Sequence, residues 1–371
     1  MLGAALRLRL RVLRRRPRVQ RHRSRSRGGR AAGAEDVGRE PVLLVSGMGG
    51  SVLHARRRSD PKFDLRVWVR ILFANLDFKK YLWSLYNAET GYVEPLDDDV
   101  EIVVPEDDHG LYAIDILDPS WFVELLHLSM VYHFHDMIDM LINCGYEKGT
   151  TLFGYGYDFR QSNRIDKAMS GLKSKLETAY KTSGGKKVFA KYINKWICIA
   201  CPFQGAPGCI NDSLLTGLQF VYGFESFFFV SRWAMHQMLT YNGKKVPLPF
   251  NMAVFKWATE TRRILENAEL PDTVSFYNIY GTSYETPYDV WLPMSQVKPE
   301  YTYVDGDCTV PIESAMADGF AAKERVGVKA DHRGLLSDEN VFELLKKWLG
   351  ASEKAQRRRH VSKAKVLDLS C

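Results

Sequence analysis

The strongest constraint on the fold is a series of short apolar runs, each of which ends in a glycine-rich or polar turn. PVLLV at residues 41–45 leads into SGMGGS, TLFGYGYDFR begins at Thr151, and KWICIACP at residues 195–202 leads into FQGAPG. SFYNIYGT at residues 275–282 and YTYVDGD at residues 301–307 follow the same pattern. Continuously apolar runs of this length are typical of strands that are buried on both faces of a sheet.

Amphipathic segments separate these runs. Residues 122–144 carry Leu, Met, Ile and Phe at helical spacing and end at Gly145, and residues 164–181 predict a second helix. Ser337 is the predicted N-cap of a last helix, which Gly350 ends. Buried strands that alternate with helices predict an α/β fold with a mostly parallel sheet and helices on both faces.

The charge of the chain predicts its domain organisation. The first 34 residues hold 12 Arg and no acidic residue, whereas the whole chain has a net charge of only +7. We expect a basic leader at residues 1–40, one folded domain at residues 41–352 and a basic tail at residues 353–371. Cap or lid inserts are expected within the domain at about 60–100 and 205–250. The domain itself is acidic, so we expect no nucleic-acid partner.

The arginine-rich leader has three interpretations: a solvated disordered tail, an organellar transit peptide, or an arm that binds anionic surfaces. It lacks the apolar core of a secretory signal, and no stretch of the chain approaches the ~20 apolar residues of a membrane-spanning helix. We expect a cytoplasmic protein, and leave contact with endomembranes and organellar import open. The scattered cysteines, including Cys198 and Cys201, are expected to be reduced core thiols.

Three predicted strand ends carry residues suited to catalysis. SGMGG at residues 46–50 can turn backbone N–H groups towards a substrate oxygen, as an oxyanion hole requires. Asp307 follows a late strand, and His332 lies 25 residues later, before the last helix. An imidazole that acts as a base needs a carboxylate to hold its tautomer, and this order matches the acid and base of an α/β-hydrolase.

A serine nucleophile is missing from this pattern. The expected G-x-S-x-G turn should lie between the helix that ends near Lys181 and the strand that begins at Lys195. TSGGKKVFAKYINKW stands there, with Ser183 as its one serine. A strand, a turn and a helix need about 20 residues, so the segment is too short to hold them.

Six segments together resemble the lecithin–cholesterol acyltransferase-like family, in its plant-type branch of phospholipases and acyltransferases. They are PVLLVSGMGGSVL, FGYGYDFRQS, CPFQGAPG, LPLPFN, YTYVDGDCTVP and VKADHRGLL. The resemblance implies an α/β-hydrolase that takes an acyl chain from a glycerophospholipid through an acyl-serine intermediate. It passes that chain to water, a sterol or another alcohol.

The resemblance also implies roles for individual residues. Asp307 matches the family's acid, His332 matches its base, and the backbone N–H of Met48 matches its first oxyanion donor. Asp158 and Arg160 match a structural motif at a strand end. Where the family has a strand, the serine turn and a helix, Val188 is joined directly to Phe189.

We therefore expect an acyltransferase or phospholipase A fold that lacks one central strand and helix and is catalytically inactive. The alternative is a non-enzymatic splice or gene-model product that at most binds lipid or a partner. The aromatic segment at residues 220–235 predicts a lid or lipid-facing helix, with core packing as the alternative. Its candidate lipid-binding residues are Phe227, Phe228, Phe229 and Trp233.

The expected partners are phospholipid at a membrane surface and an acyl acceptor. No cofactor or metal is implied, and His127, His133 and His135 are not expected to be metal ligands. The acidic run EPLDDDVEIVVPEDD lacks the pattern of a calcium-binding loop, so we expect a solvated loop there.

Overall fold

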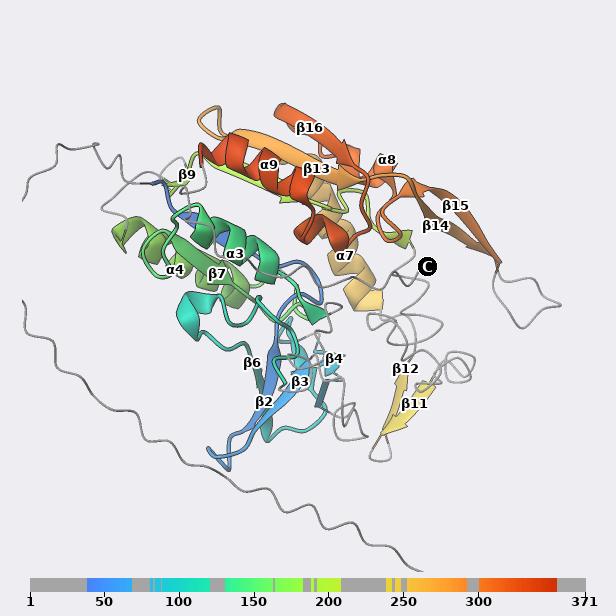
Figure 1. The fold of residues 1–371 in the computed structure, drawn as a ribbon. Coiled ribbons are helices and arrows are strands. Elements are labelled where there is room, and N and C mark those ends of the chain that lie inside the picture. Colours follow the sequence, from blue (N-terminus) through green and yellow to red (C-terminus); the bar gives the residue numbers. More distant parts are fainter. Residues whose placement is uncertain are drawn as a thin grey trace, which may run out of the picture. The chain divides into compact units, whose positions relative to one another are not determined.

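A computed structural model divides the chain into two units, residues 1–38 and residues 39–371, and each is considered by itself (Figure 1). The structure describes residues 39–68, 81–82, 84–87, 89–120, 131–162, 164–182, 188–189, 192–207, 238–241, 244–247, 252–291 and 300–351. The predicted basic tail, nearly all of the leader and the aromatic segment at residues 220–235 therefore lie outside the described residues.

Most parallel strands of the second unit lie in two sheets, and β8 and β9 form a further short parallel pair. β1 (Val42–Val45) pairs with β7 (Leu152–Tyr155), and β13 (Ser275–Gly281) pairs with β10 (Lys195–Ile199) on one edge and β16 (Ala322–Val328) on the other. Among the described strands, no pairing joins β1 to β10. The mixed α/β architecture with parallel strands is confirmed. The predicted loss of a central strand stays a prediction, and two unjoined parallel sheets are compatible with it.

The last predicted strand forms a separate hairpin rather than part of a parallel sheet. β15 (Glu300–Gly306) runs antiparallel to β14 (Tyr284–Trp291), with Tyr284 opposite Gly306. Figure 1 shows this hairpin extending beyond the ends of β13 and β16. The parallel strand at this end of the chain is β16, which sequence reasoning missed because AKERVGV holds three consecutive charged residues and so lacks the apolar run or alternation of a predicted strand.

Further strands and helices complete the unit. The three strands β2, β3 and β6 form one sheet around a smaller core that includes Trp68. The bounds are β2 (Leu53–Arg57), β3 (Asp64–Trp68), β4 (Ser84–Tyr86), β5 (Val93–Pro95), β6 (Val100–Val103), β8 (Val188–Phe189), β9 (Tyr192–Ile193), β11 (Met238–Tyr241), β12 (Lys244–Pro247), α7 (Met252–Glu266), α8 (Ile312–Met316), η1 (Asp108–Gly110) and η3 (Gly334–Leu336).

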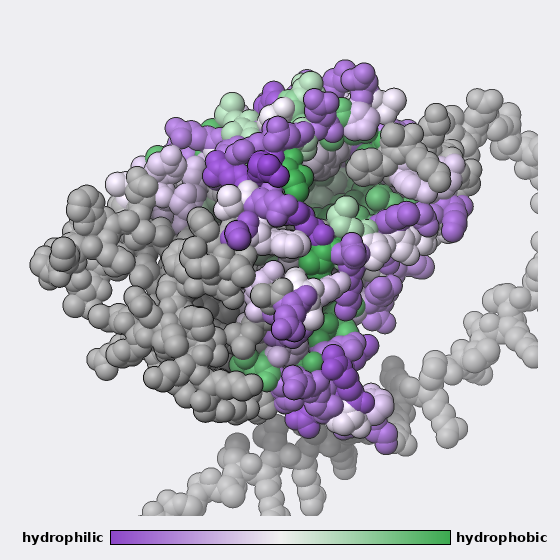
Figure 2. Space-filling model, turned by 180° about the vertical axis from the view of Figure 1, so that it is seen from behind, coloured by the Kyte–Doolittle hydropathy of each residue, from purple (hydrophilic) through white to green (hydrophobic). Residues whose placement is uncertain are grey.

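The face of the molecule in Figure 2 is mainly polar where residues are coloured. On the face shown in Figure 2, hydrophobic residues appear as separate spots among hydrophilic ones, wherever residues are coloured. Of the helices in the described part of the chain, none has both the length and the apolar character needed to cross a membrane.

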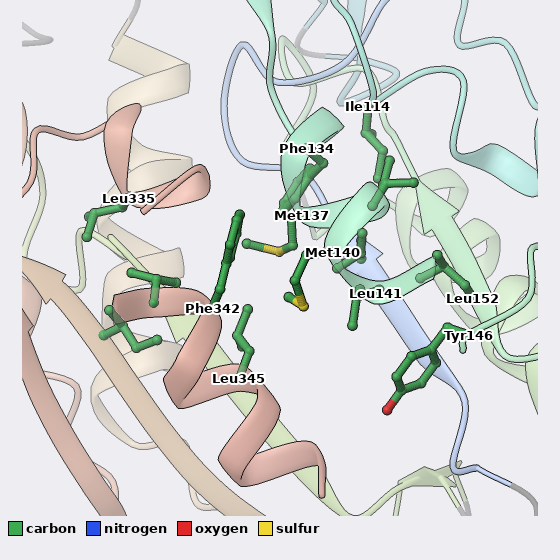
Figure 3. Packing of buried hydrophobic residues seen from close by; sticks show 14 of the residues in the cluster. Ile114, Phe134, Met137, Met140, Leu141, Tyr146, Leu152, Leu335, Phe342 and Leu345 are labelled. Atoms are coloured by element: carbon green, nitrogen blue, oxygen red, sulfur yellow. The ribbon is translucent and has the colours of Figure 1, made fainter. Parts of the chain in front are cut away.

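The main core lies between two helices and the parallel strands. Phe342 and Leu345 of α9 (Glu339–Leu349) face Met137 and Met140 of α3 (His135–Asn143), as Figure 3 shows. Leu44 of β1 and Ile279 of β13 belong to the same buried cluster. The two parallel sheets therefore share one hydrophobic core although their strands do not pair.

The predicted helix over residues 122–144 is wrong at residues 131–134, which precede α3. There the N–H of His133 donates to the carbonyl of Asp115 (3.0 Å), and that of Phe134 donates to the carbonyl of Ile114 (3.0 Å). These backbone groups pair across to another segment and leave the helical path. Residues 121–130 lie outside the described residues, whereas α4 (Asp166–Thr182) confirms the second predicted helix.

The last helix is capped by Asp338 and not by Ser337, which corrects the predicted N-cap. The carboxylate of Asp338 accepts hydrogen bonds from the N–H groups of Asn340 (2.7 Å) and Val341 (3.2 Å). Such a cap satisfies N–H groups that have no partner within the first turn of a helix. At the other end, Gly350 adopts the predicted left-handed conformation, with φ of 64°.

Candidate active site

The structure brings Asp307 and His332 together. The Nδ1 atom of His332 lies 2.8 Å from Oδ2 of Asp307, and the backbone N–H of His332 donates to the carbonyl of Asp307 (2.8 Å). The Asp307 side chain is only 1% exposed, whereas that of His332 is 37% exposed. A buried carboxylate thus holds one ring nitrogen and leaves the other for proton transfer, as the acid and base of a triad require.

Backbone groups around Asp307 fix its carboxylate. Its Oδ1 atom accepts hydrogen bonds from the N–H groups of Thr309 (3.0 Å) and Val310 (2.6 Å), so that Oδ2 is left for the histidine. Gly281, at the end of β13, allows this approach, because a Cβ there would lie 2.4 Å from Cβ of Asp307. Asp307, which directly follows the β14–β15 hairpin, therefore packs against the end of the parallel strand β13.

The segment that carries His332 forms a turn, which the side chain of Asp331 stabilises. Oδ1 of Asp331 accepts hydrogen bonds from the N–H groups of Arg333 (3.0 Å) and Gly334 (2.9 Å). Asp side chains commonly stabilise turns by bonding to the backbone two residues ahead. Asp331 is thus a positioning residue that sequence reasoning did not single out, although the Asp-His-Arg-Gly sequence contains the signal.

The SGMGG turn lies at the carboxyl end of β1, as predicted, with Met48 70% exposed. The indole N–H of Trp68 donates to the carbonyl of Gly49 (2.6 Å). The hydroxyls of Ser46 and Ser51 lie 2.6 Å apart, and Ser51 also accepts from the N–H of Tyr157 (3.1 Å). Both ends of the turn are therefore anchored. The oxyanion role of the Met48 N–H remains a prediction.

His133 lies between this turn and the acid–base pair. A Cβ added to Gly50 would stand 2.4 Å from Nε2 of His133, so the imidazole packs directly on the glycine. Burial, together with electrostatic interactions with the neighbouring His332 and Arg333, lowers the pKa of His133 to about 4. His133 is therefore neutral at pH 7. Among the described residues its buried Nε2 has no hydrogen-bond partner.

The remaining polar candidates have structural contacts. Nδ1 of His135 lies 2.7 Å from Oδ1 of Asp115, and His127 lies outside the described residues. The guanidinium of Arg160 donates to both carboxylate oxygens of Asp158 (2.8 and 2.7 Å). The thiols of Cys198 and Cys201 are unbridged. Within the ranges that the structure covers, no three His, Cys, Asp or Glu side chains form a metal-binding group.

A cavity of about 350 Å³ opens near the acid. Its lining comes from the FQGAPG segment, from the start of α8 and from the β14–β15 hairpin. Ser314 joins the first two by donating to the carbonyl of Gly205 (2.6 Å) and accepting from the N–H of Gln204 (3.0 Å). The lining residues are Gln204, Gly205, Pro207, Tyr288, Pro311, Glu313 and Ser314.

No serine in the described part of the chain is hydrogen-bonded to His332. The junction of Val188 and Phe189 forms the short strand β8, which pairs with β9. The candidate lid residues Phe227, Phe228, Phe229 and Trp233 lie outside the described residues. The candidate site therefore contains the hydrogen-bonded pair of Asp307 and His332 and an anchored glycine turn.

An acid and a base that meet at the carboxyl ends of parallel strands define an α/β-hydrolase-type protein. A family model described as "Lecithin:cholesterol acyltransferase" matches residues 79–190. Phospholipase A(1) LCAT3 of Arabidopsis thaliana is 53% identical over 424 aligned positions, which cover 89% of this chain and 95% of that protein. The chain therefore belongs to the lecithin:cholesterol acyltransferase family, which confirms the resemblance seen in the sequence.

Two further relatives share most of the chain. Lecithin-cholesterol acyltransferase-like 4 of Arabidopsis thaliana is 39% identical over 84% of this chain and 76% of its own length. A bovine lysosomal phospholipase A and acyltransferase is 23% identical over 75% of this chain and 82% of its own length. The alignment with the LCAT3 relative has 424 positions. This chain contributes 89% of its 371 residues to it, or about 330, so the remaining positions are gaps in this chain. The chain is thus shorter than that relative within the aligned region.

Proposed function

We propose that the scaffold belongs to a lipid acyltransferase or phospholipase A that cleaves acyl esters of glycerophospholipids. The observation that carries the proposal is the 2.8 Å pairing of His332 with the buried Asp307. Relatives named as phospholipases and acyltransferases support the same chemistry. The acyl acceptor would be water, a sterol or another alcohol.

In a complete active site, Nε2 of His332 would take the proton of a serine hydroxyl as its oxygen attacks the acyl carbonyl. Asp307 would stabilise the imidazolium that forms. The N–H of Met48 would donate to the oxyanion. His332 would then return the proton to the leaving lysophospholipid and, in the second half-reaction, deprotonate the acceptor.

The chain itself is proposed to be inactive, because no G-x-S-x-G segment precedes Asp307. A chimaera tests both statements. The strand, serine turn and helix of the LCAT3 relative are inserted between Val188 and Phe189, and fatty-acid release from phosphatidylcholine vesicles is measured. We expect release by the chimaera and none by the unaltered chain.

The controls separate the two statements. His332→Ala in the chimaera should abolish release. Release by the unaltered chain that a serine-directed inhibitor blocks would overturn the proposed inactivity. A chimaera that melts cooperatively but releases no fatty acid would overturn the proposed activity.

The second candidate function is non-enzymatic binding to a lipid surface. The 70% exposure of Met48 and the 44% exposure of Val45, at the end of β1, favour it. Flotation with phosphatidylcholine vesicles tests this function. Co-flotation of the unaltered chain that Met48→Ser weakens would support it, and no co-flotation would exclude it.

A further inference from the structure

In the sheets β1–β7 and β10–β13–β16, each of the outer strands β1, β7, β10 and β16 has one edge without a partner strand in the described part of the chain, and β1 and β10 are joined through Glu40. β1 pairs with β7 along one edge, and β10 pairs with β13 along one edge. Since strands buried in parallel sheets normally pair along both edges, these two open edges need an explanation.

The amino ends of β1 and β10 lie close together. Glu40, two residues before β1, accepts a hydrogen bond from Nδ2 of Asn194 (2.6 Å) and forms an ion pair with Nζ of Lys195 (2.9 Å). These contacts join the two strand starts through side chains. Because a single strand occupies two inter-strand spacings, about 10 Å in all, long side chains can join strands whose backbones stay one strand apart.

The carboxyl ends of the two sheets also lie on one side. His133 packs on Gly50 after β1, and His332, in the loop after β16, interacts electrostatically with His133. Phe134 and Ala330, each next to these loops, share one buried cluster. Since β16, β13 and β10 are mutually parallel, β1 and β10 therefore run in the same direction.

Hydrogen bonds show which backbone groups face the open edges. In β1, the N–H groups of Val42 and Ser46 donate to β7 and its flanking residue, so those of Leu43 and Val45 face the opposite way. In β10, Ala200 donates to Ile279, so Ile197 and Ile199 face away from β13. No described backbone group bonds to these four outward-facing N–H groups.

Side-chain exposure agrees with an open position. Val45 is 44% exposed although it is the last residue of an apolar parallel strand. Ile197 and Ile199 are only partly buried, whereas Phe276 and Ile279 in the doubly paired strand β13 are fully buried. A third parallel strand between β1 and β10 would cover this apolar surface and satisfy both rows of backbone groups.

We propose that the open edges of β1 and β10 form a strand slot, which binds one extended apolar strand of another polypeptide parallel to both. Only the twelve residues 183–194 separate α4 from β10, which is too few for a further parallel strand and the crossover of a dozen or more residues that it needs. Val188 and Phe189 do not fill the slot, since β8 pairs with β9. The occupant is therefore a β-branched apolar segment supplied in trans, by β-augmentation on two edges at once.

The test uses the full chain, refolded with a fluorescein-labelled peptide. The peptide has about five Val and Ile residues, then a G-x-S-x-G segment and a lysine tail. A peptide of the same composition with two prolines in the apolar half is the control, because proline cannot donate to a ladder. We expect saturable binding, a raised melting temperature and slower amide exchange at Leu43, Val45, Ile197 and Ile199 with the first peptide alone.

Backbone N-methylation distinguishes the slot from a single sheet edge. A strand in the slot donates to both neighbours, so methylating either the odd or the even peptide nitrogens should weaken binding at least about 10-fold. Addition to one edge would weaken only one of the two sets, and that result would overturn the proposal. Equal stabilisation by both unmethylated peptides, or no binding at all, would also overturn it.

A second measurement, of fatty-acid release in the presence of the peptide, rests on the proposed function and is evaluated separately from binding. The serine peptide should restore fatty-acid release, and a matched peptide with Ala in place of Ser should bind equally and restore none. Slot binding without release would contradict the proposed function and leave the slot intact. Loss of binding would contradict the slot alone, because the chimaera tests the function without it.

Discussion

The imidazole of His133 lies against the backbone of Gly50, so that a Cβ at position 50 would stand only 2.4 Å from Nε2. This contact joins the glycine turn after β1 to the region of the acid–base pair. It also explains why position 50 of SGMGG needs glycine: the His133 ring leaves no room for a Cβ there. The backbone conformation is not the reason, since Gly50, unlike Gly49, does not have a positive φ.

Gly50→Ala is expected to destabilise the fold. The new methyl group would overlap the ring of His133, and overpacking of this kind costs about 1–3 kcal/mol. Urea unfolding followed by circular dichroism measures the change. Gly47→Ala is the matched control, because nothing lies within 4 Å of a Cβ there. Equal stability of the two variants would show that the His133 ring moves away freely.

Acid is expected to weaken the fold through His133. Its pKa is lowered from 6.5 to about 4, so between these values the unfolded chain binds a proton that the folded chain does not. The free energy of unfolding should therefore fall as pH drops through this window, by at most about 1.4 kcal/mol per pH unit. His133→Gln should flatten this part of the pH profile. A variant with an unchanged slope would mean that other groups cause it.

In the chimaera, Asp307→Asn should reduce fatty-acid release by about 10⁴-fold, the scale seen when a triad acid is replaced. Because the N–H groups of Thr309 and Val310 require an oxygen at the Oδ1 position, the amide would present its NH₂ group to His332, and this donor holds the imidazole in the wrong tautomer. Asp305→Asn is the control, because Asp305 accepts from the N–H of Ser283 and does not contact His332. Comparable losses in both variants would contradict the assignment of Asp307 as the acid.

Asp338→Ala should lower the stability of the second unit by about 1 kcal/mol through loss of the N-cap of α9. Ser337→Ala should change the free energy of unfolding much less, because its hydroxyl does not cap that helix. Thermal and urea unfolding of both variants test this difference. A larger effect at Ser337 would restore the cap predicted from the sequence.

The apolar runs and their turns were enough to predict several elements and the meeting of Asp307 with His332. Other features depended on partners distant in the chain. The bonds of residues 133 and 134 to Asp115 and Ile114 keep these residues out of the predicted helix, so that α3 begins only at His135, and β15 joined β14 instead of a parallel sheet. Pairing across such distances leaves little trace in local periodicity, which records only which faces are apolar.

The sequence by itself determined the α/β class, the family and the spacing of Asp307 and His332, because strand burial and motif spacing depend on local residue patterns. Only the tertiary structure decided that His133 packs on Gly50 and that β1 and β10 each keep one edge without a described partner. Burial and backbone pairing depend on which distant segments meet, and one sequence position cannot specify its neighbour across the sheet.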